Sequence, residues 1–226
     1  MRFIDYKDWA DYIYSIYTYF GIKAESILEI GAGTCNVAKH LSQHFKNIVV
    51  VDVSKEMLRE FTSESLLKIC ADMTNLPIKK KFSFIYSTFD SVNYLLNMEM
   101  LYRFFSNIEP LLTDNGILTF DVSLITNSKK NLRHLNRKGI HNGIKYSQKS
   151  HFDEQEKIHF NYFKVKLESG EIIEETHAQK IFDFFEYFDV VEKTNLYVSE
   201  CFNAFTFDNA HGKSDRAQFI IRKRKN

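Results

Sequence analysis

Five short apolar segments separated by helical patterns organise the first 122 residues of the chain. The apolar segments lie at 26–30, 47–52, 67–70, 82–86 and 116–122. Residues with helical periodicity occupy 8–20, 34–43, 54–62 and 98–109. Strands that are apolar almost throughout are typical of parallel sheets buried on both faces. The sequence therefore predicts an α/β fold in which helices flank a mostly parallel central sheet.

The pattern changes after residue 122. Residues 140–182 alternate apolar and polar side chains in three runs, as strands with two different faces do. The alternation assigns two sets of residues to opposite faces: Ile158, Phe160 and Tyr162, and His159 and Asn161. A turn at 168–171 contains Gly170 and fits a hairpin between the last two runs. We expect 140–182 to form an antiparallel β insert beside the strand ends, where it would cover the binding site.

Two further apolar segments, at 189–198 and 217–224, predict strands that bring the central sheet to seven. No internal repeat or low-complexity segment divides the chain into two folding units. The sequence thus predicts one domain over 1–226 that carries the insert.

The charge balance argues against some partners. The net charge is +1, which gives no reason to expect nucleic acid or an anionic membrane as the main partner. The cysteines, Cys35, Cys70 and Cys201, show neither metal-ligand spacing nor a disulfide framework. No apolar stretch reaches the length of a membrane span. We expect a cytoplasmic protein without a metal site, either a monomer or a homodimer.

The segment ILEIGAGTCN, residues 27–36, is the clearest binding motif. A strand followed by glycines and a helix places backbone N–H groups against a ligand. A dinucleotide-binding loop would have a third glycine at the position of Asn36. A phosphate-binding loop would end in Gly-Lys-Ser/Thr, where this chain reads TCNVAK. Gly31 and Gly33 therefore belong to neither kind of phosphate-binding loop.

Four acidic residues lie in or after successive predicted strands: Glu29, Asp52, Asp72 and Asp90. Open α/β sheets bind ligands at the carboxyl ends of their strands. Each acid alone could be a helix cap or a solvated loop residue, but four at one edge favour a cationic ligand. S-adenosylmethionine is such a ligand, because it carries a sulfonium, an ammonium and two ribose hydroxyls. Asp52, at the end of a strand, is placed to accept both hydroxyls.

Three segments carry a resemblance to a known family: ILEIGAGTCNVAKHL, VVVDVSKEML and CADMTNLPIKKKFSFIYSTFDSVNYLL. Their order resembles the signature of class I S-adenosylmethionine-dependent methyltransferases, which have a Rossmann-like fold. The segments STFDSVNYL and EETHAQKIF are similar to those of a bacterial branch that acts on small molecules and includes amino-sugar N-methyltransferases. The resemblance implies S-adenosylmethionine as cofactor and S-adenosylhomocysteine as product.

The resemblance also implies which residues contact which part of the cofactor. Gly31 and Gly33 would line the methionine part, and Asp52 the ribose. Asp72 and Met73 would contact the adenine. Phe89 with Asp90 would lie near the sulfonium. The full set of expected cofactor-binding residues is Glu29, Gly31, Ala32, Gly33, Asp52, Val53, Asp72, Met73, Phe89, Tyr6 and Trp9.

Methyl transfer requires alignment of the reactants and removal of a proton from the acceptor. An aromatic wall would hold the sulfonium by cation–π attraction, and its candidates are Tyr6, Trp9, Phe89 and Tyr94. His177 is the candidate base, because imidazole titrates near neutral pH, and Glu175 would share its face of a strand. We expect His177, Asp90 and Tyr94 to be the catalytic residues. A purely structural role for His177 stays open.

The expected activity is methyl transfer to an N or O atom of a small-molecule acceptor that the sequence does not identify. One alternative is a methyltransferase acting on nucleic acid or protein. Base-flipping enzymes of that kind carry an Asn/Asp-Pro-Pro-Tyr/Phe stretch, whereas this chain reads TFDSVNYL without proline. The other alternative is a protein that binds the cofactor without turnover. The intact residues on the sulfonium side argue against it.

Overall fold

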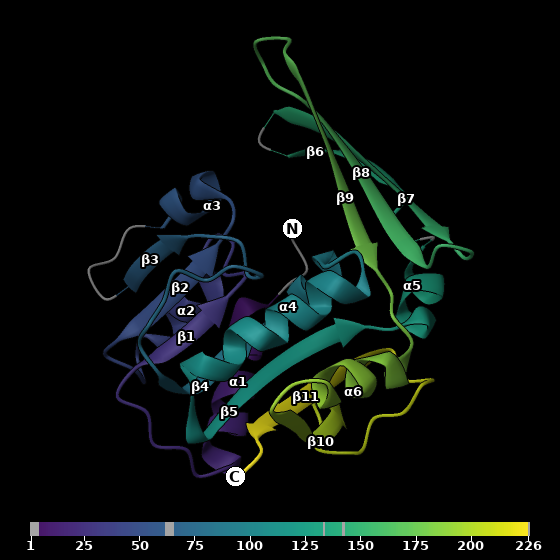
Figure 1. The fold of residues 1–226 in the computed structure, drawn as a ribbon. Coiled ribbons are helices and arrows are strands. Elements are labelled where there is room, and N and C mark those ends of the chain that lie inside the picture. The colour runs from purple at the N-terminus through teal and green to yellow at the C-terminus, as the bar shows by residue number, and fades with distance from the viewer. Residues whose placement is uncertain (1–4, 62–65, 133, 142, 226) are drawn as a thin grey trace.

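A computed structural model describes residues 5–61, 66–132, 134–141 and 143–225 of the chain. The central sheet has seven strands in the order β10-β11-β5-β4-β1-β2-β3 (Figure 1). Their bounds are β1 Ile27–Ile30, β2 Ile48–Asp52, β3 Leu66–Cys70, β4 Phe82–Ser87, β5 Leu112–Ser123, β10 Leu196–Asn203 and β11 Arg216–Lys223. The predicted α/β fold with a seven-stranded sheet is confirmed.

The strand directions determine where a ligand can bind. β1 pairs in parallel with β2 on one side and with β4 on the other, and β3 and β5 continue these parallel pairs outward. Only β11 runs antiparallel to its neighbours β5 and β10. The order of the chain reverses between β1 and β4, and such a switch point is where open α/β sheets bind ligands. The residues after β1, β2, β3 and β4 therefore meet at one edge.

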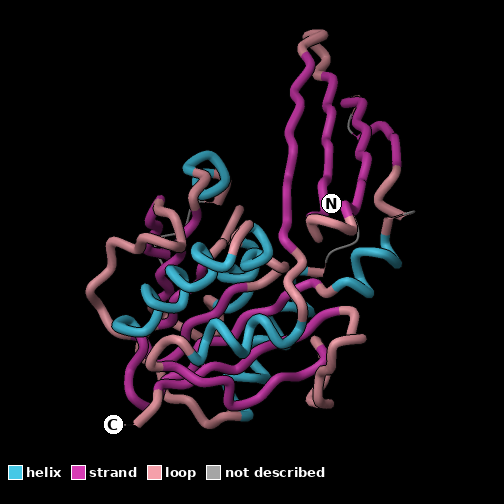
Figure 2. The backbone as a smooth tube through the Cα atoms, turned by 45° about the vertical axis from the view of Figure 1, so that its right-hand side comes forward, coloured by secondary structure: helices cyan, strands magenta, loops and turns pink. Residues whose placement is uncertain are grey.

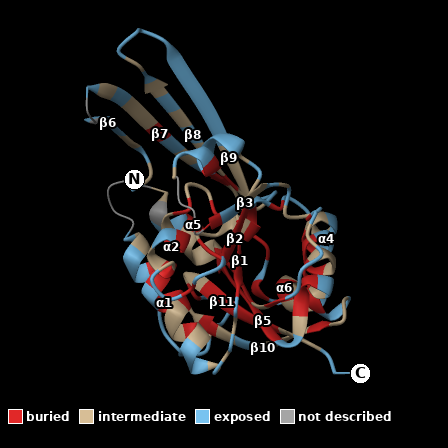
Figure 3. Cartoon of the chain, turned by 90° about the vertical axis from the view of Figure 1, so that its left-hand side faces the viewer, coloured by how far each residue is buried: buried red, intermediate tan, exposed pale blue. Residues whose placement is uncertain are grey.

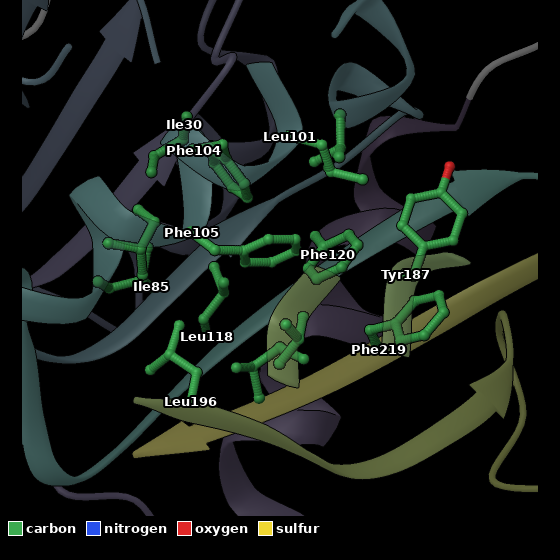
Figure 4. Packing of buried hydrophobic residues seen from close by; sticks show 14 of the residues in the cluster. Ile30, Ile85, Leu101, Phe104, Phe105, Leu118, Phe120, Tyr187, Leu196 and Phe219 are labelled. Atoms are coloured by element: carbon green, nitrogen blue, oxygen red, sulfur yellow. The ribbon is translucent and has the colours of Figure 1, made fainter. Parts of the chain in front are cut away.

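Helices cover both faces of the sheet. One core contains buried side chains of α4 (Met98–Ile108) and α6 (Phe184–Glu192), which pack on sheet residues such as Phe120 and Phe219 (Figure 4). The other core contains buried side chains of α1 (Tyr6–Tyr19), α2 (Asn36–Leu41) and α3 (Lys55–Arg59). Figure 3 shows the strands buried between these layers. The short helices η1 (Ser91–Tyr94) and η2 (Glu109–Leu111) flank α4 in the chain.

The predicted insert is an antiparallel sheet that stands on the central domain (Figures 1 and 2). It has four strands where three were predicted, because β6 begins before residue 140 and was missed. Its strands are β6 Arg137–His141, β7 Ile144–Asp153, β8 Ile158–Lys166 and β9 Ile172–Lys180. The helix α5 (Ile125–Asn131) leads into it from β5. Leu167 N–H donates to the Glu171 carbonyl at 2.9 Å, which closes the predicted hairpin turn. Residue 142, within the predicted span 140–182, lies outside the described residues.

Two predicted elements need correction. The strand predicted at 189–198 is wrong in its first part, because α6 continues to Glu192 and β10 begins at Leu196. The helix predicted at 54–62 is shorter and ends at Arg59, and residue 62 lies outside the described residues. The error at α6 has a physical reason: its aromatic and β-branched residues favour strands in isolation, but burial of Tyr187, Val190 and Val191 stabilises the helix.

The start of α6 depends on an acidic side chain. The Glu186 carboxylate accepts a hydrogen bond from the Asp183 N–H at 2.6 Å, as in a capping box. We expect Glu186→Ala to lower the free energy of unfolding by about 1 kcal/mol, measured by urea denaturation. Glu192→Ala at the other end of α6 is the control, because a negative charge there is unfavourable. Equal destabilisation by both variants would contradict the capping role.

Candidate functional site

The turn after β1 has a backbone that only small residues permit. Gly31 and Gly33 have φ values of +71° and +53°. The N–H groups of Gly31 and Ala32 donate to the Val51 carbonyl at 2.8 and 3.0 Å. A Cβ atom on Gly31 would lie 2.7 Å from the Cβ and Oγ atoms of Ser91. The glycine motif therefore joins β1 closely to β2 and to η1, and it leaves no room for a side chain.

Cys35 takes the third left-handed position of this turn, with φ +60°. Its side chain is fully buried in the core under α1 and α2. Burial, with the negative charge of Glu29 adding to it, raises the pKa of the Cys35 thiol to about 11. The thiol therefore stays protonated and unreactive at neutral pH.

Asp52, at the end of β2, holds two loops together. Its Oδ2 accepts from the Gly33 N–H at 2.7 Å, and its Oδ1 accepts from the Ser54 N–H at 2.8 Å. Each carboxylate oxygen has a second lone pair, so both can accept a further hydrogen bond from a ribose hydroxyl. Val53 beside it is 72% exposed, as a residue that lines a ligand site can be. The position of Asp52 suits the predicted ribose contact.

Glu29 differs from the other three acids. Its side chain is 1% exposed in the middle of the sheet, and its Oε2 has no hydrogen-bond partner among the described residues. Burial raises the pKa of Glu29 to about 8, so the carboxyl group is mostly neutral at pH 7. It therefore supplies little of the negative charge expected at this edge. Its contact with the cofactor stays a prediction.

Asp72 and Met73 form a turn beside the glycine motif. Asp72 Oδ1 accepts from the N–H and the hydroxyl of Thr74 at 2.7 and 2.8 Å, which fixes the turn after β3. The Met73 Cε lies 3.7 Å from the position that a Cβ on Gly31 would take. The predicted adenine loop and the predicted methionine-binding turn are thus neighbours.

Three of the four predicted wall aromatics do pack together. The ring of Phe89 lies 5.3 Å from that of Tyr6 and 4.7 Å from that of Trp9, centroid to centroid. The sequence analysis missed Phe205, whose ring lies 4.6 Å from Trp9. Tyr94 is separate from this group and pairs with His177. The wall therefore consists of side chains from α1, the loop after β4 and the loop before β11.

Tyr94, His177 and Glu175 form a chain of polar contacts between η1 and β9. The Tyr94 hydroxyl lies 2.8 Å from His177 Nδ1, and His177 Nε2 lies 3.5 Å from the Glu175 carboxylate. Burial, with the charges of Asp90 and Asp52, raises the pKa of Tyr94 to about 12. Tyr94 therefore keeps its proton and can donate it to Nδ1 of a neutral His177, which places the ring proton on Nε2 toward Glu175.

The insert turns toward the strand ends a face that carries a cluster of polar side chains, here called its polar face, beside the apolar side chains of Phe152, Phe163 and Val165. His159 is 5% exposed on this face, whereas Tyr162 on the opposite face is 43% exposed. The register places further polar residues on the same face as His159: Gln148, Ser150, Asn161, His177 and Gln179. Gln148 donates to Asn161 at 3.2 Å and accepts from Arg137 at 3.0 Å. Most of this face was missed, although the alternating pattern contains it.

Asp90 does not lie free at the strand ends. Its Oδ1 accepts from Arg216 at 2.9 Å, and its Oδ2 accepts from Gln179 Nε2 at 2.9 Å. The sequence analysis missed Arg216 and the buried Asp121, which also binds Arg216. Asp90 therefore joins the loop after β4 to β9 and β11. Its predicted catalytic role stays a prediction.

Within the described ranges, no three or more side chains of His, Cys, Asp and Glu gather in a way that could hold a metal ion. None of the helices found there is long and apolar enough to span a bilayer.

The fold and the glycine turn define a class I methyltransferase architecture, and comparisons with known proteins agree. Residues 27–116 match the family described as "Methyltransferase domain". A putative methyltransferase of Geobacillus sp. is 30% identical over 124 residues, which are 52% of this chain and 50% of that protein. The matched region thus spans about half the length of that relative.

Solved structures resemble the chain over nearly all of its length. An S-adenosylmethionine-dependent methyltransferase from Clostridium acetobutylicum has a TM-score of 0.84 at 22% identity and covers 99% of this chain and 94% of its own. CalS10, an amino pentose methyltransferase from Micromonospora echinaspora solved with S-adenosylmethionine bound, has a TM-score of 0.72 at 13% identity and covers 98% and 93%.

The match over residues 27–116, fewer than half of the chain, and the likeness in fold over nearly all of its length agree with the resemblance that the sequence showed. The described residues fit S-adenosylmethionine as a cofactor, because the carboxylate of Asp52 has free lone pairs beside the glycine turn. The methyltransferase fold is confirmed, while the activity of the whole chain and its acceptor are not established.

Proposed function

We propose that the protein transfers the methyl group of S-adenosylmethionine to an N or O atom of a small molecule bound between the cofactor and the insert. The observation that carries this proposal is the 2.8 Å contact between Tyr94 and His177. It joins the loop after β4, where the sulfonium is expected, to the polar face of the insert. An acceptor bound against this pair would lie beside both the methyl donor and a base.

The cofactor would occupy the edge formed by the ends of β1 to β4. The turn of Gly31 and Gly33 would lie against its methionine part, Asp52 would accept its ribose hydroxyls, and Met73 would pack on its adenine. Bound S-adenosylmethionine supplies an activated methyl group as a sulfonium. Phe89 supplies an aromatic surface that attracts the sulfonium and excludes water.

The chain's own residues would orient and deprotonate the acceptor. Transfer is an in-line displacement, so alignment supplies much of the acceleration. An ammonium acceptor must lose a proton before it attacks, and a hydroxyl acceptor must lose one during attack. We assign this step to the pair of Tyr94 and His177: the Tyr94 hydroxyl would take the acceptor's proton as it passes its own proton to His177 Nδ1, and Glu175 would stabilise the imidazolium that results. The polar insert face, which includes Gln148 and Asn161, suits an acceptor rich in hydrogen-bonding groups.

The proposal is tested by measuring release of S-adenosylhomocysteine from purified protein. The acceptors are small amines, amino sugars and phenols, and amino sugars come first because the structural neighbour CalS10 is an amino pentose methyltransferase. We expect turnover with at least one of these classes and none with short DNA, RNA or peptides. Turnover with a nucleic acid or a peptide alone would contradict the proposal. So would tight cofactor binding without turnover across the whole panel.

A further inference from the structure

Arg216, at the start of β11, binds two carboxylates at once. Its Nη1 donates to Asp90 Oδ1 at 2.9 Å and also to Asp121 Oδ2 on β5. The side chain of Asp121 is fully buried, and those of Arg216 and Asp90 are about one-fifth exposed, at 22% and 18%. Burial opposes the charge on Arg216, but the two carboxylates outweigh it and raise its pKa. One guanidinium group thus offsets the charge of one carboxylate and lies between two of them in a largely dry site.

The same cluster holds a strained turn. Phe89 and Asp90 have φ values of +59° and +50°, the left-handed conformation that residues with a Cβ rarely adopt. Asp121 Oδ2 accepts from the Asp90 backbone N–H at 2.9 Å. Strained residues persist only where the surrounding structure fixes them, and they often mark functional sites. Here Arg216 and Asp121 fix the turn that carries the Phe89 ring.

The cluster also contacts the aromatic wall and the insert, which lie on two sides of the site. The Arg216 guanidinium lies over the Trp9 ring at 5.6 Å, so it contacts the aromatic wall from α1. Gln179, on the polar face of the insert, donates to Asp90 Oδ2 at 2.9 Å. A displacement of Asp90 would therefore shift the aromatic wall and the insert together.

We propose that Arg216 is a positioning residue for methyl transfer. By binding Asp90 and Asp121 at once, it keeps the two carboxylates together and holds the Phe89–Asp90 turn, and through that turn it aligns the aromatic wall and the insert around the reacting atoms. This inference rests on the proposed function, because the turn is assigned to the cofactor side of the site. Arg216 itself contacts neither reactant in this account.

Loss of the guanidinium has a consequence that depends on pH. Burial, only partly opposed by Arg216, raises the pKa of Asp121 to about 6. Without Arg216, two carboxylates would share the site, and one would retain its proton to a higher pH. A protonated carboxyl group can donate a hydrogen bond to the other carboxylate. In a variant without the Arg216 charge, the Phe89–Asp90 turn should therefore keep its conformation at lower pH. The turn should lose that conformation as the pH rises and both Asp90 and Asp121 ionise.

Other titratable groups around the cluster do not obscure this effect. Tyr12 on α1, Tyr94 on η1 and Tyr187 on α6 all have pKa values raised mainly by burial, so they stay neutral. Burial lowers the pKa of His159 on β8, which favours the neutral imidazole over the pH range of the test. His177 on β9 is present in both the variant and the unaltered protein, so the difference between these two proteins at pH of about 6.5 and about 8.5 reports mainly on the two acids.

The test is Arg216→Gln, with two readouts at both pH values. The first is the affinity for S-adenosylhomocysteine by calorimetry. The second is the emission of Trp9, the single tryptophan of the chain, measured without ligand. We expect the affinity of the variant, relative to the unaltered protein, to fall about tenfold or more at pH ~8.5 and to recover in part at pH ~6.5, since each unit of pKa shift is a factor of ten. The Trp9 emission should shift with pH in the same way.

Three comparisons make the test decisive. Arg216→Gln with Asp121→Asn should abolish the new pH dependence, and Arg222→Gln, farther along β11, should leave both readouts as in the unaltered protein. Arg216→Lys keeps the charge and should show no new pH dependence, and Arg216→Met replaces Arg216→Gln if that variant does not fold. Unchanged emission at both pH values in the variant that lacks the charge would overturn the inference. If the unaltered protein binds no S-adenosylhomocysteine, that result overturns the proposed function instead. The emission of Trp9 would still test whether Arg216 holds the Phe89–Asp90 turn.

Discussion

Asp52→Ala is expected to weaken the binding of S-adenosylmethionine by about 10²–10⁴-fold. The substitution would remove two charge-assisted hydrogen bonds to the ribose, worth about 1.5–3 kcal/mol each before solvent compensation. It would also free the Gly33 N–H, which now donates to Asp52 at 2.7 Å. Isothermal titration calorimetry with S-adenosylmethionine and S-adenosylhomocysteine measures the change.

Two further variants separate the ribose contact from the structural one. Asp52→Asn keeps an acceptor oxygen for Gly33 but loses the charge, so it should lie between the unaltered protein and Asp52→Ala. Asp114→Ala removes an exposed acid near the start of β5 and should leave the affinity unchanged. An unchanged cofactor affinity in Asp52→Ala would contradict the placement of the ribose.

His177→Ala is expected to lower kcat by about 10²–10⁴-fold while the cofactor affinity stays nearly constant. The imidazole contacts Tyr94 and Glu175 but none of the residues assigned to the adenine or ribose. If the acceptor is an amine, the loss should shrink as pH rises through the pKa of that amine, because a neutral amine needs no base. Steady-state kinetics over a pH series measures both effects.

The control for this variant lies on the same sheet. His151 is an exposed histidine on β7 that faces away from the polar side of the insert, so His151→Ala should retain full turnover. Tyr94→Phe should lower kcat less than His177→Ala does, because His177 would lose only the partner of its Nδ1. If His177→Ala turned over at the rate of the unaltered protein at every pH, His177 would be structural.

The central sheet could be predicted because its information is local. Each strand of its parallel half is an apolar run, and the glycines at 31 and 33 mark the turn after the first of them. The same local pattern misled at α6, where residues 189–192 were predicted as the start of a strand. Glu186, three residues after Asp183, was a usable signal for the start of that helix.

The charged cluster could not be predicted in the same way. Arg216 and Asp121 are 95 residues apart in the chain and meet only because β11 pairs with β5. The one available signal was an acid within the apolar run of β5, since a buried charge implies a partner. The neutral state of Glu29 is equally non-local, because it follows from burial by both neighbouring strands.

The most direct test of the account is a crystal structure with S-adenosylhomocysteine bound. We expect both ribose hydroxyls on the Asp52 carboxylate, the adenine against Met73, and the sulfur facing Phe89 on the side of Tyr94 and His177. A product molecule bound elsewhere, or one whose sulfur points away from the polar face of the insert, would contradict the account.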